Sequence, residues 1–266
     1  MSLSRPRLAR AAAMACAVSS CVHLAPAPRA SVSAPEPEPA PAPEPEPAPE
    51  PEPAPEPATS PRHLEDEDGR VDVYRPESGG GRAPLVVFLH GMCMDPSDVC
   101  DAVQSSGREA SFLVCPAGNA RCGDAFDWAG PKEARTHAVA AALVAVDAAV
   151  GARVDHAGDV LVGYSRGAYL ARDVLLDGVA RFRGVVFLGA AVDPPADRLR
   201  AAGIERAVFA CGDYDGARRT MQRAAAKLAA SGLDAKFVSL GPMGHGLPRD
   251  IDAVLKGAYA WIRTGS

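Results

Sequence analysis

The stretch GYSRG (163–167) places one serine between two glycines, where an apolar run gives way to a helix-like pattern. A serine hydroxyl that projects from the tip of a strand, on a strained backbone, can act as a nucleophile. Glycines two residues before and after that serine remove side chains that would collide with neighbouring backbone. The pattern therefore predicts a nucleophile at Ser165, although small residues also flank serines in ordinary strand–helix junctions.

Strand-length apolar runs alternate with helix-length amphipathic segments after residue 70. The continuously apolar run PLVVFLHG is typical of a strand buried on both faces, whereas RVDVY alternates in period two and predicts an edge strand. The alternation predicts an α/β fold, a mostly parallel sheet with helices on both faces. Strands are expected at 70–74, 84–91, 111–116, 159–165, 184–190, 206–212 and 234–241, and helices at 132–151, 166–178, 195–203, 215–232 and 248–263.

Gly-x-Ser-x-Gly at a turn from strand to helix resembles the nucleophile elbow of the α/β-hydrolases, and the resemblance covers nearly all of residues 70–263. Within that superfamily the chain is most similar to small lidless esterases of the dienelactone-hydrolase and polyester-depolymerase type. The segment FLHGM (88–92) matches the family's His-Gly turn after an early strand. The match implies an oxyanion hole formed by the backbone N–H groups of Met92 and Arg166. It makes His90 a structural residue of the turn rather than the base.

The same resemblance implies an acid and a base. The segment ACGDYDG ends the strand two after the nucleophile strand, and the family's Gly-x-x-Asp pattern there indicates Asp215. Asp213 and, more distantly, Asp193 are the alternatives for the acid. A carboxylate is needed to orient a histidine and to stabilise its cation, but Asp215 could also be only a helix N-cap. His245 lies in a glycine-flanked loop after the last strand, where the fold needs a base.

The implied chemistry is two-step acyl transfer from a carboxylic ester. His245 would take the proton of Ser165 as the serine oxygen attacks the carbonyl, and water would then cleave the acyl-enzyme. No metal and no organic cofactor is required. The short link near residues 190–195, where larger relatives insert a lid, implies an open cleft for a small-molecule or polymeric ester. Trp128 and Tyr164 are expected to line that cleft and bind the substrate.

Two other classes of function stay open. A serine peptidase or an acyltransferase could use the same fold, because a fold does not determine a function. A non-catalytic envelope protein could use a tethered domain of this type for binding, although such a protein would not need a complete triad. The net charge of −5 is spread along the chain without a basic stripe, so nucleic acid is not an expected partner. The sequence does not indicate an oligomeric state.

The N-terminal segment predicts export. Arginines precede a short apolar run, and VSSC (18–21) resembles the lipobox of bacterial lipoproteins. We expect a signal peptide over 1–20 and a lipidated Cys21 that anchors the protein to a membrane of the cell envelope. Secretion, or release into the periplasm, is the alternative. Residues 21–63 are rich in Pro and Glu and predict a disordered spacer, and the hydrolase domain is expected over 64–266.

Four cysteines lie in two loop-like stretches, CMDPSDVC and CPAGNARC. In an oxidising compartment they predict two disulfides. Three pairings are possible, and the short spacing favours the local one, Cys93 with Cys100 and Cys115 with Cys122. Metal ligation is the alternative, but no Cys-x-x-Cys or His-x-x-x-His spacing accompanies these residues. Cys211, at the end of an apolar run, is expected to be a buried free thiol.

Overall fold

The computed structural model describes residues 62–65, 69–78 and 81–264 of the 266-residue chain. The predicted signal peptide, the predicted lipidation site Cys21 and the Pro/Glu-rich segment through residue 61 lie outside the described residues. Within the described ranges, eight strands form one sheet in the order β1-β2-β4-β3-β7-β8-β9-β10.

The sheet is mostly parallel, as the alternation of strands and helices predicts. The strands from β4 through β10 in that order are mutually parallel, whereas β2 runs antiparallel to both β1 and β4. The central strands β3, β4, β7 and β8 are buried at every residue, which agrees with helices on both faces. The strands are β1 (Arg62–Glu65), β2 (Arg70–Tyr74), β3 (Leu85–Leu89), β4 (Phe112–Pro116), β7 (Val160–Tyr164), β8 (Gly184–Leu188), β9 (Arg206–Cys211) and β10 (Asp234–Ser239).

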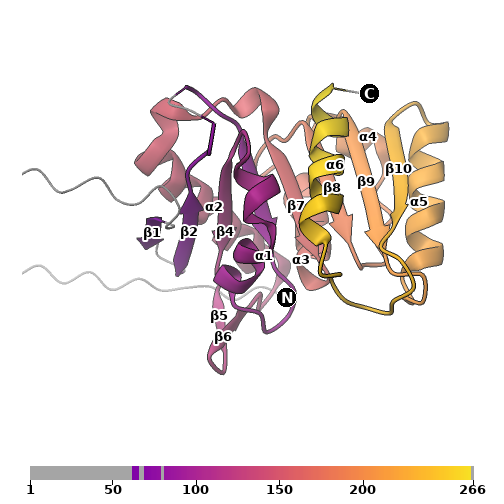
Figure 1. Ribbon diagram of the computed structural model, residues 1–266, viewed down its shortest axis with the longest axis horizontal. Coiled ribbons are helices and arrows are strands. Elements are labelled where there is room, and N and C mark those ends of the chain that lie inside the picture. Colours follow the sequence, from indigo (N-terminus) through magenta and orange to yellow (C-terminus); the bar gives the residue numbers. More distant parts are fainter. Residues whose placement is uncertain (1–61, 66–68, 79–80, 265–266) are drawn as a thin grey trace, which may run out of the picture. The chain divides into compact units, whose positions relative to one another are not determined.

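Helices cover both faces of the sheet (Figure 1). Two helices, α1 and α6, pack against each other and share one apolar core with one face of the sheet. The other four helices contribute to a second core on the opposite face. The helices are α1 (Pro96–Arg108), α2 (Lys132–Val150), α3 (Arg166–Asp177), α4 (Ala196–Ala201), α5 (Arg218–Ala230) and α6 (Ile251–Thr264).

Several elements are absent from the prediction. The strand β1 pairs with the outer side of β2, so the prediction that RVDVY is an edge strand is wrong. A two-stranded hairpin, β5 (Ala120–Cys122) and β6 (Ala125–Asp127), lies in the stretch taken as a loop. These strands are three or four residues long and carry too few residues for a periodic signal.

The helix α1 begins inside CMDPSDVC, which the sequence predicts as a loop, although the helix start carries recognisable signals. Asp95 is the N-cap, and its side chain accepts a hydrogen bond from the backbone N–H of Ser97 at 2.8 Å. Pro96 follows at the first helical position, where its missing N–H costs nothing.

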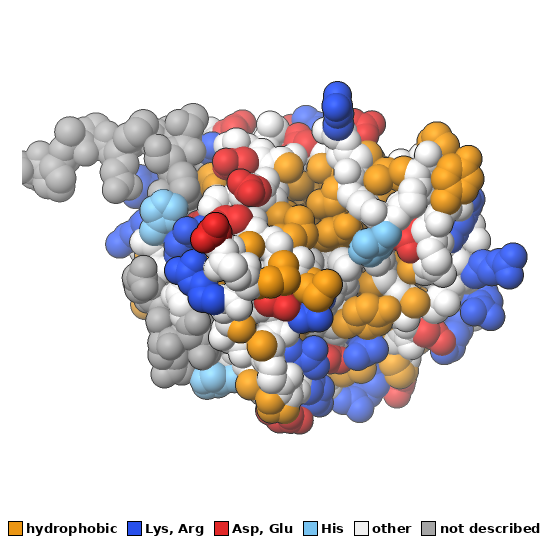
Figure 2. All heavy atoms as spheres, turned by 90° about the horizontal axis from the view of Figure 1, so that it is seen from below, with side chains coloured by type: hydrophobic (Ala, Val, Ile, Leu, Met, Phe, Trp, Pro, Cys, Tyr) orange, Lys and Arg blue, Asp and Glu red, His pale blue; other side chains and the backbone are white. Residues whose placement is uncertain are grey.

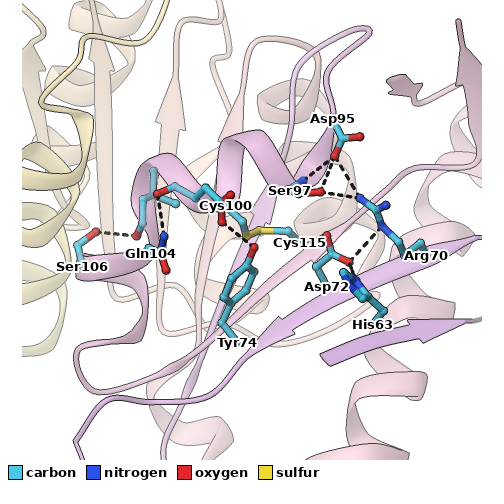
Figure 3. Close-up of a disulfide and its surroundings, with 12 residues drawn as sticks. His63, Arg70, Asp72, Tyr74, Asp95, Ser97, Cys100, Gln104, Ser106 and Cys115 are labelled. Carbon is cyan, nitrogen blue, oxygen red and sulfur yellow. Dashed lines mark hydrogen bonds and ion pairs between the residues drawn. A yellow bond between two sulfur atoms is a disulfide. The ribbon is translucent and has the colours of Figure 1, made fainter. Parts of the chain in front are cut away.

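Two disulfides form, but the predicted local pairing is wrong. Cys93 pairs with Cys122, and Cys100 pairs with Cys115, with Cα–Cα distances of 5.3 and 6.3 Å. The physical reason is α1, because the helix carries Cys100 into the core against β4, where Cys115 lies. Figure 3 shows this bridge joining α1 to β4, beside the side chain of Tyr74. The Tyr74 hydroxyl donates a hydrogen bond to Asp101 of α1 at 3.0 Å.

The prediction for the remaining cysteine in the described residues is confirmed. Cys211 is a free thiol at the buried end of β9. Burial, together with the negative charge of Asp215, raises the pKa of this thiol to about 11. The thiol therefore stays protonated at neutral pH and packs as a small apolar group.

Candidate active site

The turn around Ser165 has the strained geometry that the flanking glycines predict. Ser165 lies between β7 and α3 with φ 52° and ψ −115°, and its N–H donates to the carbonyl of Leu188 at 2.8 Å. A Cβ at Gly163 would overlap the backbone of Gly167, and a Cβ at Gly167 would overlap the carbonyl oxygen of Leu89. Both positions therefore require glycine, and the serine hydroxyl is left at the end of the strand.

Three residues far apart in the sequence meet at the carboxyl ends of the parallel strands. The His245 Nε2 atom lies 2.9 Å from the Ser165 Oγ, and its Nδ1 lies 2.9 Å from a carboxylate oxygen of Asp215. The side chain of His245 is half exposed, whereas that of Asp215 is 6% exposed. The arrangement puts an imidazole between a hydroxyl and a nearly buried carboxylate, which is the geometry for moving a proton from the hydroxyl to the imidazole.

The structure distinguishes among the three candidate acids by their partners. Asp213 forms an ion pair with Arg218 at 2.7 Å, and Asp193 forms one with Lys227 at 3.1 Å. Only Asp215 of the three contacts His245. The N-cap alternative for Asp215 is wrong, because Ala217 is the N-cap of α5. The second carboxylate oxygen of Asp215 accepts a hydrogen bond from the N–H of Ala217 at 2.8 Å, in the turn that precedes the helix. Each oxygen thus has one partner, which fixes the carboxylate in place.

Tyr164 lies against the imidazole of His245. The two rings stack with centroids 5.5 Å apart and an interplanar angle of 18°. Burial and the nearby charge of Asp215 raise the pKa of the Tyr164 phenol, which therefore stays neutral. Gly189 leaves room for both rings, since a Cβ there would lie 3.2 Å from the His245 ring and 3.3 Å from the Tyr164 ring. Contact of Tyr164 with a substrate stays a prediction.

The two predicted oxyanion donors come from segments that are packed together. A Cβ at Gly167 would meet the backbone of Leu89 and His90, so the start of α3 lies directly on the turn after β3. An Nη atom of Arg166 also lies 3.1 Å from the Met92 sulfur. Within the described ranges, the backbone N–H groups of Met92 and Arg166 have no hydrogen-bond acceptor. That these two N–H groups form an oxyanion hole stays a prediction.

Trp128 does not line the cleft, which corrects the sequence-based expectation. The residue is 1% exposed, its indole Nε1–H donates to the carbonyl of His90 at 3.0 Å, and its ring packs on the His90 ring. A buried indole needs an acceptor for its N–H, and the turn after β3 supplies one. Trp128 therefore packs against the turn that follows β3 and stabilises it through His90.

His90 is a buried residue of that turn, in agreement with the structural role expected for it. Its two ring nitrogens lie 2.7 Å from the carbonyl oxygens of Gly91 and Ala117. Burial lowers the pKa of His90, whereas hydrogen bonds to the two carbonyl oxygens act in the opposite direction. With both nitrogens occupied, His90 has none left to act as a base.

Solved structures share this architecture. Esterase PE8 is 21% identical, matches 75% of this chain and 99% of its own, and has a TM-score of 0.57. TT1662 from Thermus thermophilus is 18% identical over 77% of this chain and 98% of its own, at a TM-score of 0.58. A Pyrobaculum calidifontis esterase is 17% identical over 77% of this chain and 84% of its own, at 0.56. The chain has the α/β-hydrolase fold. No protein-family model and no curated protein matches it by sequence.

The link that follows β8 in this fold is short. The chain passes from the end of β8 at Leu188 to the start of α4 at Ala196 in a short link, so no lid is inserted there. Figure 2 looks at the lower end of the sheet as drawn in Figure 1, toward which the parallel strands run, and hydrophobic side chains gather across it. Large apolar side chains exposed near the ends of these strands include Met92 (56%) and Tyr214 (75%).

Metal ligation by the four loop cysteines is the alternative to two disulfides. Across 62–65, 69–78 and 81–264, no group of three or more His, Cys, Asp or Glu side chains is placed to hold a metal ion. The four loop cysteines are paired in disulfides instead.

Proposed function

We propose that this protein is a serine hydrolase that cleaves carboxylic esters through an acyl-enzyme at Ser165. The observation that carries the proposal is the position of His245, 2.9 Å from both the Ser165 hydroxyl and the Asp215 carboxylate. A hydroxyl, an imidazole and a nearly buried carboxylate in this order form a nucleophile, a general base and the group that orients the base.

In the proposed reaction, the Ser165 oxygen attacks the ester carbonyl while His245 Nε2 takes its proton. The N–H groups of Met92 and Arg166 bind the negative oxygen of the tetrahedral intermediate, helped by the positive N-terminal end of α3. The imidazolium then donates its proton to the leaving alcohol, and an acyl-serine remains. Water attacks the acyl-serine by the same route in reverse, which releases the acid and restores the hydroxyl.

The open, apolar surroundings of Ser165 support a substrate class. Without a lid between β8 and α4, and with Met92 and Tyr214 exposed near the ends of the strands, the site suits short or medium acyl esters, or one segment of a polyester chain. Esterase PE8, the Pyrobaculum calidifontis esterase and two esterases from Rhizomucor miehei have the same fold, which favours an ester over an amide. We further propose that the protein is exported and held at the cell envelope through a lipid on Cys21.

A fluorophosphonate probe tests the proposed nucleophile directly. The folded protein is expected to be labelled covalently, and Ser165→Ala is expected to remain unlabelled with an unchanged circular dichroism spectrum. A panel of nitrophenyl esters of rising acyl length then identifies the preferred chain, and matched anilides test for peptidase activity. A folded wild-type protein that neither labels nor hydrolyses any ester would leave a non-catalytic binding role in its place.

A further inference from the structure

Two non-glycine residues in the described part of the chain have positive φ, Ser165 at 52° and Cys93 at 51°. The strain at Ser165 belongs to the nucleophile turn. Cys93 directly follows Met92, whose N–H is a proposed oxyanion donor. A residue with a Cβ stays in this conformation only where its surroundings enforce it. The question is what holds the loop of residues 91–94 in this shape.

The β5–β6 hairpin is bonded to the second half of this loop, at Cys93 and Met94. Cys93 is bonded to Cys122 at the end of β5. One residue further on, Met94 and Phe126 of β6 exchange two backbone hydrogen bonds, at 3.1 and 3.2 Å. One covalent bond and two hydrogen bonds therefore fix residues 93 and 94, which directly follow Met92 in the chain, against the hairpin.

The side chain of Arg166 joins the hairpin to the nucleophile turn. Its guanidinium lies 2.5 Å from the carboxylate of Asp127, the last residue of β6, and 3.1 Å from the sulfur of Met92. The residue that follows the nucleophile thus contacts both the hairpin and the loop that carries the other donor. Trp128, directly after β6, donates to the carbonyl of His90 on the near side of Met92.

We infer that the β5–β6 hairpin positions the loop of residues 91–94, which carries the proposed oxyanion donor Met92. The Cys93–Cys122 disulfide and the Arg166–Asp127 ion pair are the contacts through which it does so. The inference rests on the proposed function, because it concerns the donor that Met92 would supply. It follows that ester hydrolysis depends on the oxidation state of this disulfide. A dithiol reductant supplies two electrons and two protons, leaves thiols at Cys93 and Cys122, and is itself oxidised to a disulfide.

The first test removes the bridge. In Cys93→Ser/Cys122→Ser, kcat for a nitrophenyl ester should fall about 10- to 100-fold, less than the loss of an entire oxyanion donor, while KM changes less than about twofold. The affinity for an alkyl boronate, which forms a tetrahedral adduct on the serine, should fall in parallel with kcat/KM. A merely structural role would not separate the boronate affinity from KM. The control is Cys100→Ala/Cys115→Ala, in which kcat at a temperature where the protein is folded should not change.

The second test leaves the wild-type sequence intact. Cys93 is exposed, whereas Cys100 and Cys115 are buried. A low dithiothreitol concentration should therefore reduce the Cys93–Cys122 bridge first. Activity should then fall while the circular dichroism spectrum is unchanged, and re-oxidation should restore it. The double serine variant should not respond to the same treatment.

The third test addresses the ion pair. Asp127→Asn keeps the acceptor for the N–H of Trp128 but removes the charge opposite Arg166, and kcat should fall several-fold with KM unchanged. Equal kcat and equal boronate affinity in the wild type, the double serine variant and Asp127→Asn would overturn the inference. Because the wild type would still be labelled by fluorophosphonate in that case, this failure is distinct from failure of the proposed function.

Discussion

A histidine–aspartate pair is present at each end of the parallel strands, and strand β7 connects the two. Ser165 follows the last residue of β7, next to His245 and Asp215, whose atoms are 2.9 Å apart. Asp159 precedes the first residue of β7, and a carboxylate oxygen of Asp159 lies 2.7 Å from Nδ1 of His156. The two pairs have nearly the same geometry, so the distance between imidazole and carboxylate does not by itself identify a catalytic group.

The pairs differ in what the second imidazole nitrogen faces. Nε2 of His245 faces a hydroxyl, which can give up its proton, whereas Nε2 of His156 lies 3.4 Å from the carboxylate of Asp147. Carboxylates only accept hydrogen bonds, so an imidazole between two of them donates from both nitrogens and is favoured as the protonated cation. Asp159 also accepts a hydrogen bond from the N–H of Leu85 at 2.7 Å, and so connects β7 to the start of β3. The group that faces Nε2 therefore separates the two pairs: the Ser165 hydroxyl makes the His245 pair suited to catalysis, and the Asp147 carboxylate makes the His156 pair structural.

The same substitution in both pairs should have opposite effects on activity and stability, and the largest effect is expected for Asp215→Asn. The amide oxygen can still accept the hydrogen bond from the N–H of Ala217, but the amide N–H₂ would face Nδ1 of His245. The imidazole would then carry its proton on Nε2, which could no longer accept the proton of Ser165. We expect kcat/KM for a nitrophenyl ester to fall about 10⁴-fold, with a melting temperature within about 2 °C of the wild type.

The matched control for the acid is Asp213→Asn. Asp213 pairs with Arg218 and does not contact His245, so kcat/KM should stay within about threefold. A large loss in Asp213→Asn together with a small loss in Asp215→Asn would show that the acid is misassigned.

The next prediction concerns the tight backbone packing at the catalytic end of β7. In Gly167→Ala the new methyl group would overlap the carbonyl oxygens of Leu89 and His90, and backbone cannot move aside as a side chain can. We expect a loss of about 3 kcal/mol or more in the free energy of unfolding, measured by urea denaturation. Gly257→Ala in α6 is the control, because nothing lies within 4 Å of its Cβ position. That change should stabilise the protein by about 0.5–1 kcal/mol. Equal stabilities for the two variants would contradict the packing argument.

At the opposite end of β7, Asp159→Asn should change stability and leave activity alone. The substitution removes the charge that pairs with His156, while the amide oxygen can still accept from Leu85. Because Asp159 is buried, we expect the free energy of unfolding to fall by about 1–2 kcal/mol. The kcat/KM of the folded variant should stay within about twofold of the wild type. A loss of activity as large as that of Asp215→Asn would show that the two ends of the strand are not functionally separate.

The catalytic end could be predicted from the sequence because strand order fixes where each strand ends. Ser165 and Asp215 follow the buried strands β7 and β9, and His245 follows β10, the last strand of the chain, which is half exposed. Parallel strands deliver their carboxyl ends to the same edge of a sheet, so locating the strands was enough to bring the residues together.

The hairpin end of the site could not be predicted in the same way. The partner of Cys93 depends on a hairpin with three-residue strands, and the partner of Cys100 depends on α1, whose start at Asp95 and Pro96 was read as a loop. Trp128 was misassigned for a related reason. Whether an aromatic residue in a loop faces solvent or the core depends on tertiary contacts, here the carbonyl of His90, that leave no local pattern.

The smallest expected effect is the pH dependence of the structural pair. Burial lowers the pKa of His156, but the hydrogen bond and charge of Asp159 and the charge of Asp147 outweigh it, so the net shift is upward. Burial also raises the pKa of Asp159, so both groups bind protons more tightly in the folded protein, and stability falls as pH rises. The stabilisation from His156 should be complete below its unfolded pKa of about 6.5 and lost as pH rises through the higher folded value. Because the imidazole is half exposed, His156→Gln should cost less than about 1 kcal/mol in urea denaturation at pH 5.5 and still less at pH 8.5. A larger cost at pH 8.5 would mean that the neutral imidazole is the stabilising form. The two carboxylates beside His156 would then not stabilise it through its positive charge, which is the difference from His245 argued above.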